Sequence, residues 1–308
     1  MSETSTVISS ENNQKYKYSH VFFENMPSYL YPIYLKKIYL DVMGKRLDLK
    51  NPKLFTEKIQ WLKFNDNISI KTQWSDKLLL RNLVSEKIPE LKFPKVYTQG
   101  NSFEELDFNV CPNEFIIKTN HAWKQNYFVS DKNKFLANND KEYNTVRYIF
   151  NYYLSKHFAF SSGFEMQYKD INRKVYVEEF IRGDSQNLDL NYKIYCFNGV
   201  PRIIEHYIND GEIIDNQRIA VFDTGWKQLD VAYTYPKYQG MPIPPPENLN
   251  KMLEYSKILS KDFKFVRIDF LNTCEKLYLS EMTFTPSSGF IFFNPIEYDA
   301  ILGEMLNL

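Results

Sequence analysis

Two short segments in the last fifty residues of the sequence combine charged and apolar residues in a pattern that could perform chemistry. In the first segment, Arg267 and Asp269 alternate with apolar residues, so a strand would place both on one face. In the second segment, Glu281 and Thr283 share a face for the same reason. If the two strands pair as a hairpin, one face carries all four side chains.

Two adjacent carboxylates repel each other unless a cation neutralises them. Their hard oxygen atoms suit Mg²⁺ that is held together with substrate phosphates. Arg267 beside them could bind a developing anionic oxygen through two parallel hydrogen bonds. The same pattern also fits an ordinary solvated face on which Arg267 and Asp269 form an ion pair. These residues alone leave both interpretations open.

Several common catalytic motifs are absent from the sequence. There is no GxxxxGK[ST] or GxGxxG glycine loop, no GxSxG nucleophile turn and no HExxH zinc motif. The three cysteines and four histidines lack metal-ligand spacing, which predicts neither a disulfide framework nor a zinc site. Only His121, within a candidate phosphate-binding loop, invites a functional interpretation.

Composition excludes some function classes. The chain has 308 residues with 38 basic and 38 acidic side chains, so bulk attraction to nucleic acid or anionic lipid is not expected. Aromatic residues make up 17%, which fits either the codon bias of an AT-rich genome or a sugar-stacking surface. Residues 1–20 are polar and predict a disordered tail. Without a signal-peptide core or long apolar segment, we expect a soluble, cytoplasmic protein.

The elements that must position these residues are predicted from periodicity and turn signals. Helices are expected over 29–43, 75–87, 141–156, 247–260 and 297–306, and another is expected to start near Pro52 and to carry the apolar stripe of Phe55, Ile59 and Leu62. Strands are expected over 114–118, 127–129, 175–181, 192–197, 202–207, 263–270 and 277–282. Asn198-Gly199 is a strong hairpin signal. Helices come first and hairpins later, without a repeated βαβ rhythm, which favours an α+β fold.

The charged segments also resemble a known superfamily. Residues 281–289 resemble the Glu-x-Asn-x-x-Pro-Gly ending of ATP-grasp ligases, and Arg267-Ile268-Asp269 resembles the Arg-Val-Asp that precedes it. Asp76-Lys77 and Lys118 match two nucleotide-binding positions in the same order along the chain.

A closer resemblance, over about residues 40–306, is to the TupA-like ATP-grasp family. It rests on residues 51–63, Asp76-Lys77, residues 192–199 and residues 281–286, together with Gly44. That family is associated with teichuronopeptide synthesis and with loci for bacterial capsule or cell-surface polysaccharide.

The resemblance implies an ATP-grasp fold in which two α+β subdomains clasp ATP, after a short helical N-terminal region. The expected divisions are a tail over 1–20, a helical region over 21–70 and subdomains over 71–180 and 181–308. The implied cofactor-binding residues are Lys77, Lys118, Lys193, Glu178, Glu179, Ile181 and Asp184. The implied metal ligands are Asp269, Glu281 and Thr283, with Arg267 and Lys193 as catalytic residues.

Two positions depart from the family pattern. The loop over 119–126 lacks the glycines that normally approach phosphate, so either Lys124 supplies charge instead or the loop no longer binds phosphate well. Thr283 stands where related ligases often have a metal-binding Asn, which puts its role as a ligand in question.

The implied function is an ATP- and Mg²⁺-dependent carboxylate–amine ligase that forms an acyl phosphate and then an amide. Its expected partners are ATP, an acidic sugar or glycan precursor and an amine, with peripheral association with a polysaccharide assembly complex. The alternatives are a glycan kinase on the same fold, or a non-catalytic nucleotide- or glycan-binding protein. A phosphorylated product would indicate the kinase, and an amide the ligase.

Overall fold

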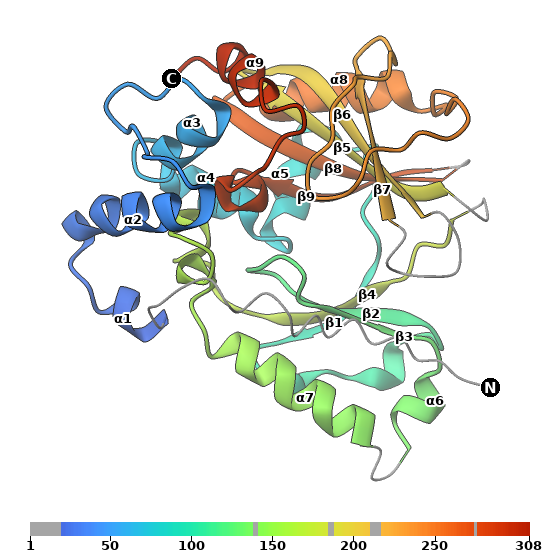
Figure 1. Cartoon of the computed structure of the whole chain (residues 1–308). Coiled ribbons are helices and arrows are strands. Elements are labelled where there is room, and N and C mark those ends of the chain that lie inside the picture. Colours follow the sequence, from blue (N-terminus) through green and yellow to red (C-terminus); the bar gives the residue numbers. More distant parts are fainter. Residues whose placement is uncertain (1–19, 138–140, 184–187, 210–216, 274–275) are drawn as a thin grey trace. The chain divides into compact units, whose positions relative to one another are not determined.

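A computed structural model of the chain describes residues 20–137, 141–183, 188–209, 217–273 and 276–308 (Figure 1). The described residues form two compact units: the first holds those up to 46 and 95–180, and the second holds 47–94 and those from 181 onward. This division differs from the predicted one, because residues 47–94 belong to the second unit. The predicted tail, except for His20, lies outside the described residues, as does Asp184.

The first unit is built on a four-stranded antiparallel sheet. Its strand order is β1-β4-β2-β3, with bounds β1 Val96–Gly100, β4 Val175–Glu179, β2 Phe115–Thr119 and β3 Asn126–Val129. The expected hairpin of residues 114–118 and 127–129 is confirmed by the pairing of β2 with β3. β1 was not predicted from the sequence.

Helix α7 (Lys141–Leu154) covers one face of this sheet (Figure 1). Val146 and Phe150 of α7 pack against Phe115, Ile117 and Val177 of the strands. Alternate residues of β2 and β4, including Lys118 and Glu178, therefore lie on the opposite face. The unit also contains α1 (His20–Glu24), α2 (Tyr31–Met43) and α6 (Lys132–Phe135).

The second unit is built on a five-stranded antiparallel sheet. Its order is β7-β6-β5-β8-β9, with bounds β7 Gln217–Asp223, β6 Val200–Asn209, β5 Leu188–Phe197, β8 Phe265–Asn272 and β9 Leu277–Thr283. The predicted turn between β5 and β6 is confirmed, since Asn198 and Gly199 have φ angles of 46° and 79°. Both angles are left-handed, as a two-residue hairpin of this kind requires.

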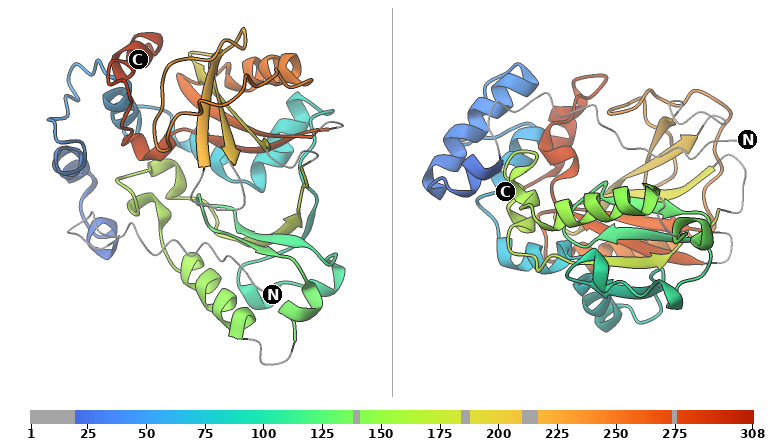
Figure 2. Two further views of the ribbon diagram at one scale, coloured as in Figure 1. Left: turned by 45° about the vertical axis from the view of Figure 1, so that its right-hand side comes forward. Right: turned by 90° about the horizontal axis from the view of Figure 1, so that it is seen from below.

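One face of this sheet packs against helices α8 (Leu249–Ser260), α4 (Ile68–Ser75) and α5 (Leu79–Lys87), and Figure 2 shows α8 beside the strands. The opposite face meets α3 (Phe55–Leu62) and α9 (Tyr298–Met305), where Phe55 packs against Phe197 and Phe265. α4 was not predicted. α5 begins at Leu79 rather than at Ser75, because the Asp76 carboxylate accepts hydrogen bonds from Leu78 N and Leu79 N.

Helix α3 is fastened to α9 by buried polar contacts. Thr56 donates from its backbone N and its hydroxyl to the Asp299 carboxylate, at 2.8 and 2.7 Å. Lys58 Nζ donates to the carbonyl oxygens of Gly303 and Leu306, at 2.9 and 2.7 Å. A Cβ on Gly303 would lie 2.2 Å from the carbonyl oxygen of Lys53, so only glycine permits this approach.

The C-terminal end of α3 and the residue after it also form hydrogen bonds with the segment that follows β9. Ser287 and Ser288 are left-handed, with φ angles of 47° and 53°, which is strained for residues other than glycine. Lys63, only 1% exposed, donates to the Ser288 carbonyl oxygen at 2.9 Å, and Gln60 donates to the carbonyl oxygens of Ser288 and Gly289. These contacts stabilise the strained backbone next to the charged strands.

Most of the aromatic side chains in the described residues contribute to the cores of the units. The exposed aromatic rings are those of Phe22, Tyr29, Phe128, Tyr148, Tyr152 and Phe292. A continuous sugar-stacking surface is therefore not the main use of the aromatic surplus. Within the described ranges, no helix combines the length and the apolar character needed to span a bilayer.

Candidate functional site

A row of charged side chains crosses four strands of the second unit. The strand pairing places Glu205 on β6 opposite Lys193 on β5, Lys193 opposite Asp269 on β8, and Asp269 opposite Glu281 on β9. Directly paired residues share a face, so all four lie on the face opposite α8. The hairpin predicted for Arg267, Asp269, Glu281 and Thr283 is confirmed, since Arg267 also pairs with Thr283.

Arg267 connects the acidic groups of this face. Its Nε donates to Asp269 Oδ1 and its Nη2 to Asp269 Oδ2, both at 2.6 Å. Nη2 also lies 3.3 Å from Glu281 Oε1 and 3.2 Å from Thr283 Oγ1. A single guanidinium therefore offsets the charge of both carboxylates, and it occupies both oxygens of Asp269.

Lys77 reaches the same face from the turn between α4 and α5. Its Nζ lies 3.2 Å from Glu281 Oε2. The sequence predicted that Lys77 and Glu281 belong to one site, and the structure brings them together across about two hundred residues of sequence. Lys193 lies one strand farther along the row, with its Nζ 4.0 Å from Glu205 Oε1.

Burial and neighbouring charges together shift the pKa values of Glu281 and Asp269 in opposite directions. Burial raises the pKa of Glu281, but Lys77, Arg267 and Lys193 outweigh this and lower it to about 2. Burial raises the pKa of Asp269, and neighbouring Glu281 adds to that effect against the opposing influence of Arg267 and Lys193. Two carboxylates at directly paired positions repel each other, so this arrangement favours the binding of a further cation, such as a metal ion, beside them.

The donor set fits Mg²⁺ held together with phosphate. Among the described residues, no group of three or more His, Cys, Asp and Glu side chains could hold a metal ion on its own. Asp269 and Glu281 supply two carboxylates, and the Thr283 hydroxyl lies next to them. Mg²⁺ commonly takes one or two protein carboxylates and completes its coordination with water and substrate phosphate.

The first unit carries its own pair of charged groups. Lys118 on β2 and Glu178 on β4 form an ion pair on the face opposite α7. Glu178 is buried, whereas Lys118 is partly exposed. Apolar side chains flank them on the same face. Ile116 pairs directly with Glu178 and Phe128, and the Phe128 and Phe180 rings contact each other in a tilted arrangement with centroids 4.4 Å apart.

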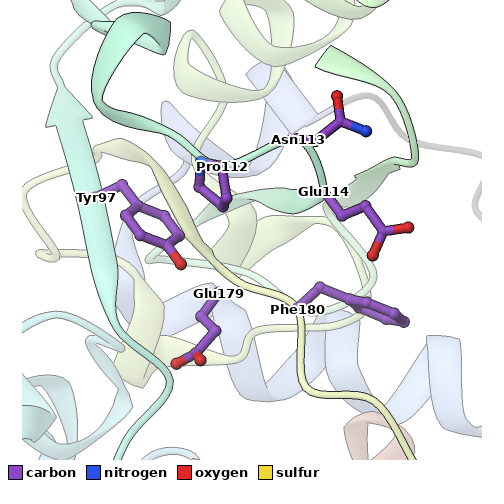
Figure 3. Close-up of a pocket in the computed structure, with 6 residues that line it drawn as sticks. All are labelled: Tyr97, Pro112, Asn113, Glu114, Glu179 and Phe180. Carbon is purple, nitrogen blue, oxygen red and sulfur yellow. The ribbon is translucent and has the colours of Figure 1, made fainter.

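Glu179 differs from its neighbour Glu178. It alternates to the other face of β4, and its carboxylate accepts a hydrogen bond from Lys95 N at 3.1 Å. With Tyr97, Glu114, Phe180 and adjacent loop residues it lines a cavity of about 370 Å³ at the end of the sheet (Figure 3). In Figure 3 the Glu114 carboxylate and the Phe180 ring lie close together, while Tyr97 lies beside Glu179. The Glu179 side chain thus does not join the Lys118 face.

The loop without glycines is anchored by its side chains. Thr119 Oγ1 donates to Gln125 Oε1 at 2.7 Å, and Trp123 Nε1 donates to the buried Glu165 carboxylate at 3.1 Å. Lys124 has a left-handed φ of 57°, and its exposed ammonium lies 5.6 Å from the centroid of the Trp123 ring. His121 is fully buried, so it belongs to the anchoring of the loop rather than to its surface.

Two other sequence predictions have different outcomes. Ile181 is the second residue after β4 and is half-buried, while Asp184 lies outside the described residues. Sequence reasoning missed Glu205, which is 1% exposed and accepts hydrogen bonds from Tyr195 and Tyr233. Its signal in the sequence was an acidic residue directly after Ile203 and Ile204 in the strand predicted over 202–207.

Comparison with solved structures finds ATP-grasp enzymes at low identity. D-alanine–D-alanine ligase from Bacillus anthracis, complexed with ATP, is 15% identical, with 68% of this chain and 53% of that chain covered and a TM-score of 0.37. The ligase of the same name from Helicobacter pylori is 16% identical, with 82% and 65% covered and a TM-score of 0.40. The ATP-grasp ligase PsnB, in complex with a precursor variant, Mg and ADP, is 10% identical, with 79% and 62% covered and a TM-score of 0.42.

This chain spans between about half and two thirds of the length of those solved chains. A search of curated protein sequences gave no match. A family model described as TupA-like ATPgrasp, in contrast, matches residues 57–307, which include both sheets and the whole charged row. The α+β fold predicted from the sequence is confirmed, and the chain belongs to the TupA-like ATP-grasp family.

Proposed function

We propose that this chain is an ATP- and Mg²⁺-dependent carboxylate–amine ligase that acts in the biosynthesis of a bacterial capsule or cell-surface polysaccharide. The observation that supports the chemistry most directly is the paired Asp269 and Glu281, beside Arg267 and Lys77, in a member of an ATP-grasp family. The proposed substrates are a uronic acid of a glycan precursor and an amino acid or other amine.

The proposed reaction has two steps. A carboxylate oxygen attacks the γ-phosphorus of ATP, and the bond to the β-phosphate oxygen breaks to release ADP. The amine then attacks the carbonyl carbon of the acyl phosphate, loses a proton and expels inorganic phosphate, which leaves an amide. The protein contributes by positioning the reactants and offsetting charge.

Asp269 and Glu281 are the proposed metal ligands, with the Thr283 hydroxyl beside them. These residues would hold Mg²⁺ together with the phosphates of ATP, and the ion would offset part of their negative charge. Arg267 now occupies both oxygens of Asp269, so it must release at least one for that carboxylate to bind a metal. The guanidinium then becomes available to a phosphate oxygen or to the oxyanion of the second step.

Each unit supplies its own groups for the nucleotide in this proposal. Lys77 and Lys193 of the second unit and Lys118 of the first bind phosphate oxygens. Glu178 and Ile181, with the backbone of Glu179, bind adenine next to the apolar surface of Phe128 and Phe180. Asp184 is proposed for the ribose, and exposed Lys124 supplies charge where glycine amides are missing.

Hydroxylamine offers a test that does not require the natural amine. The purified chain is incubated with Mg²⁺, ATP, hydroxylamine and a panel of uronic acids, and both ADP and hydroxamate are measured. Acid-dependent formation of both supports the ligase. The variant Asp269→Asn with Glu281→Gln should abolish both signals, while Glu254→Gln, an exposed carboxylate on α8, should retain them.

Other outcomes would contradict the proposal in distinct ways. A phosphorylated sugar without hydroxamate would identify a kinase. Nucleotide binding without ADP release for any acid would identify a non-catalytic protein. Binding itself is measured by thermal unfolding, since a ligand at about 100 times its Kd stabilises the native state by about 2.7 kcal/mol.

A further inference from the structure

Glu205 is the one member of the charged row for which neither the sequence analysis nor the proposed reaction has a role. It lies on β6, directly opposite Lys193, and therefore on the face that carries Asp269 and Glu281. Its side chain is 1% exposed. An ionised carboxylate at this depth is costly unless neighbouring groups offset its charge.

Two phenols fix the position of this carboxylate. Glu205 Oε2 accepts hydrogen bonds from the hydroxyl groups of Tyr195 at 2.6 Å and Tyr233 at 2.9 Å. Tyr195 lies on the same face of β5 as Lys193, two residues farther along the strand, and Tyr233 comes from the loop after β7. Burial raises the pKa of Glu205, but Lys193, Arg267 and the Tyr195 hydroxyl outweigh it and lower the pKa, so the group is charged at neutral pH.

The ammonium of Lys193 is held near Glu205 without being hydrogen-bonded to it. Nζ lies 4.0 Å from Oε1, beyond the length of a hydrogen bond, and 4.3 Å from the centroid of the Tyr207 ring. Among the described residues it makes no hydrogen bond. A structural ion pair would be expected to close to about 2.8 Å. Here the charge is held in place while the donors of the ammonium stay available.

We propose that Glu205, fixed by Tyr195 and Tyr233, is a positioning residue for Lys193. It keeps the ammonium on the face of Asp269, ready to donate to a phosphate oxygen of the nucleotide. This inference rests on the proposed function, because it gives Lys193 a phosphate ligand. It adds that the affinity contributed by Lys193 depends on the charge of a residue that does not touch the nucleotide.

A purely structural role and a positioning role for Glu205 predict different effects of Glu205→Gln on nucleotide binding. If the role is purely structural, Glu205→Gln would lower the stability of the fold and leave the folded protein with unchanged affinity for nucleotides. A positioning role predicts weaker binding of the Mg²⁺ complex of ATP by folded protein, with no change for adenosine, which has no phosphate. Comparing these two ligands therefore separates the two roles.

The experiment is a double-mutant cycle measured by calorimetric titration, with MgATP and adenosine as ligands. The variants are Glu205→Gln, Lys193→Met and their combination, used below their unfolding temperatures. We expect MgATP affinity to fall about tenfold in Lys193→Met and about fivefold in Glu205→Gln. The combined variant should be no weaker than Lys193→Met, because Glu205 acts through Lys193. If the loss of MgATP affinity in the combined variant equals the product of the losses in the two single variants, the two residues act independently and the inference is overturned.

Two further variants complete the design. Tyr233→Phe removes one hydrogen bond to Glu205 while keeping the ring, and should weaken MgATP binding by a smaller factor even if Glu205→Gln folds poorly. Asp299→Asn changes a buried carboxylate of the same unit that lies outside the row, and should lower stability alone. If Lys193→Met weakens binding and neither Glu205→Gln nor Tyr233→Phe does, this inference fails and the proposed function stands. If neither Lys193→Met nor Lys77→Met changes the affinity for MgATP, this inference and the proposed function both fail.

Discussion

The charged faces of the two units are built on opposite plans. In the second unit, six charged side chains from β5, β6, β8, β9 and the turn before α5 lie in or beside one row. Within it, Arg267 contacts Asp269, Glu281 and the Thr283 hydroxyl. On the corresponding face of the first unit, the ion pair of Lys118 with Glu178 lies among apolar and aromatic side chains. The first plan suits the concentrated charge of a metal and phosphates, and the second suits a ligand that is mostly flat and apolar with one charged end.

The comparison also shows how each unit offsets buried charge. Glu178 has the ammonium of Lys118, whereas Asp269 and Glu281 share the guanidinium of Arg267, and Glu281 also has the ammonium of Lys77. A shared guanidinium can give up one partner and keep another. The row is therefore suited to exchanging ligands, and the ion pair of the first unit to keeping its geometry.

The largest effect should come from removing the charge of the two carboxylates. Asp269→Asn with Glu281→Gln should lower ADP release with a competent acid by about a thousandfold or more, because the proposed metal loses its protein ligands. The measurement is the initial rate of ADP formation. Glu254→Gln serves as the control, and a double variant that kept half the wild-type rate would remove the row from the chemistry.

The first unit should respond mainly through stability. Lys118→Met leaves the buried Glu178 carboxylate without this ammonium and should cost about 3 kcal/mol, measured by urea unfolding. Lys118→Met combined with Glu178→Met should recover most of that stability but bind MgATP at least as weakly as Lys118→Met, because Glu178 is itself proposed to bind adenine. Exposed Lys134→Met is the matched control. Full recovery of MgATP affinity in the combined variant would contradict a phosphate-binding role for Lys118.

The pH dependence of stability should reveal the linked charges of the row. The pKa of Glu281 is lowered from 4.5 to about 2 in the folded chain, so its stabilising effect is complete above about pH 5 and is lost as the pH falls toward 2. The difference in free energy of unfolding between wild type and Glu281→Gln should therefore be largest at pH 7 and shrink below pH 4.5. A difference that is the same at pH 7 and pH 3 would mean that Lys77 and Arg267 do not hold this carboxylate in its charged form.

The smallest effect should come from the aromatic surface of the first unit. Phe128 is 43% exposed and contacts the Phe180 ring, so Phe128→Ala should cost about 1 kcal/mol or less of stability. If this surface binds adenine, the variant should lose severalfold affinity for both ATP and adenosine. Phe292→Ala, an exposed ring of the second unit, should change neither affinity. If Phe128→Ala lost affinity for ATP but not for adenosine, the adenine base would not bind at this surface.

The positions of Arg267, Asp269, Glu281 and Thr283 could be predicted because each depends only on alternation within a strand and on one hairpin. The turn at Asn198-Gly199 was equally local. The anchored loop, in contrast, depends on Glu165, which lies some forty residues beyond Trp123. No local pattern connects those two residues.

Glu205 shows why register limits such predictions. Counting back from the turn pairs Phe197 with Val200 and Cys196 with Pro201, which would place Lys193 opposite Ile204. A bulge between Tyr195 and Cys196 shifts the register by one residue, so Lys193 faces Glu205 instead. A shift of one residue moves a side chain to the other face of the sheet. The pairing of Lys193 with Glu205 therefore could not be predicted, because it depends on a bulge for which the sequence analysis found no signal.

The contacts of α3 with Asp299 and Gly303 have a consequence for synthesis of the chain on the ribosome. These contacts join residues that are more than 240 positions apart, and the whole sheet of the first unit is translated between them. The first sheet can form while the nascent chain is still growing, but α3 must wait for residues 299–306 to emerge from the exit tunnel. Until then Phe55 and its apolar neighbours have no partner helix, which makes this interval the one in which a chaperone would matter most.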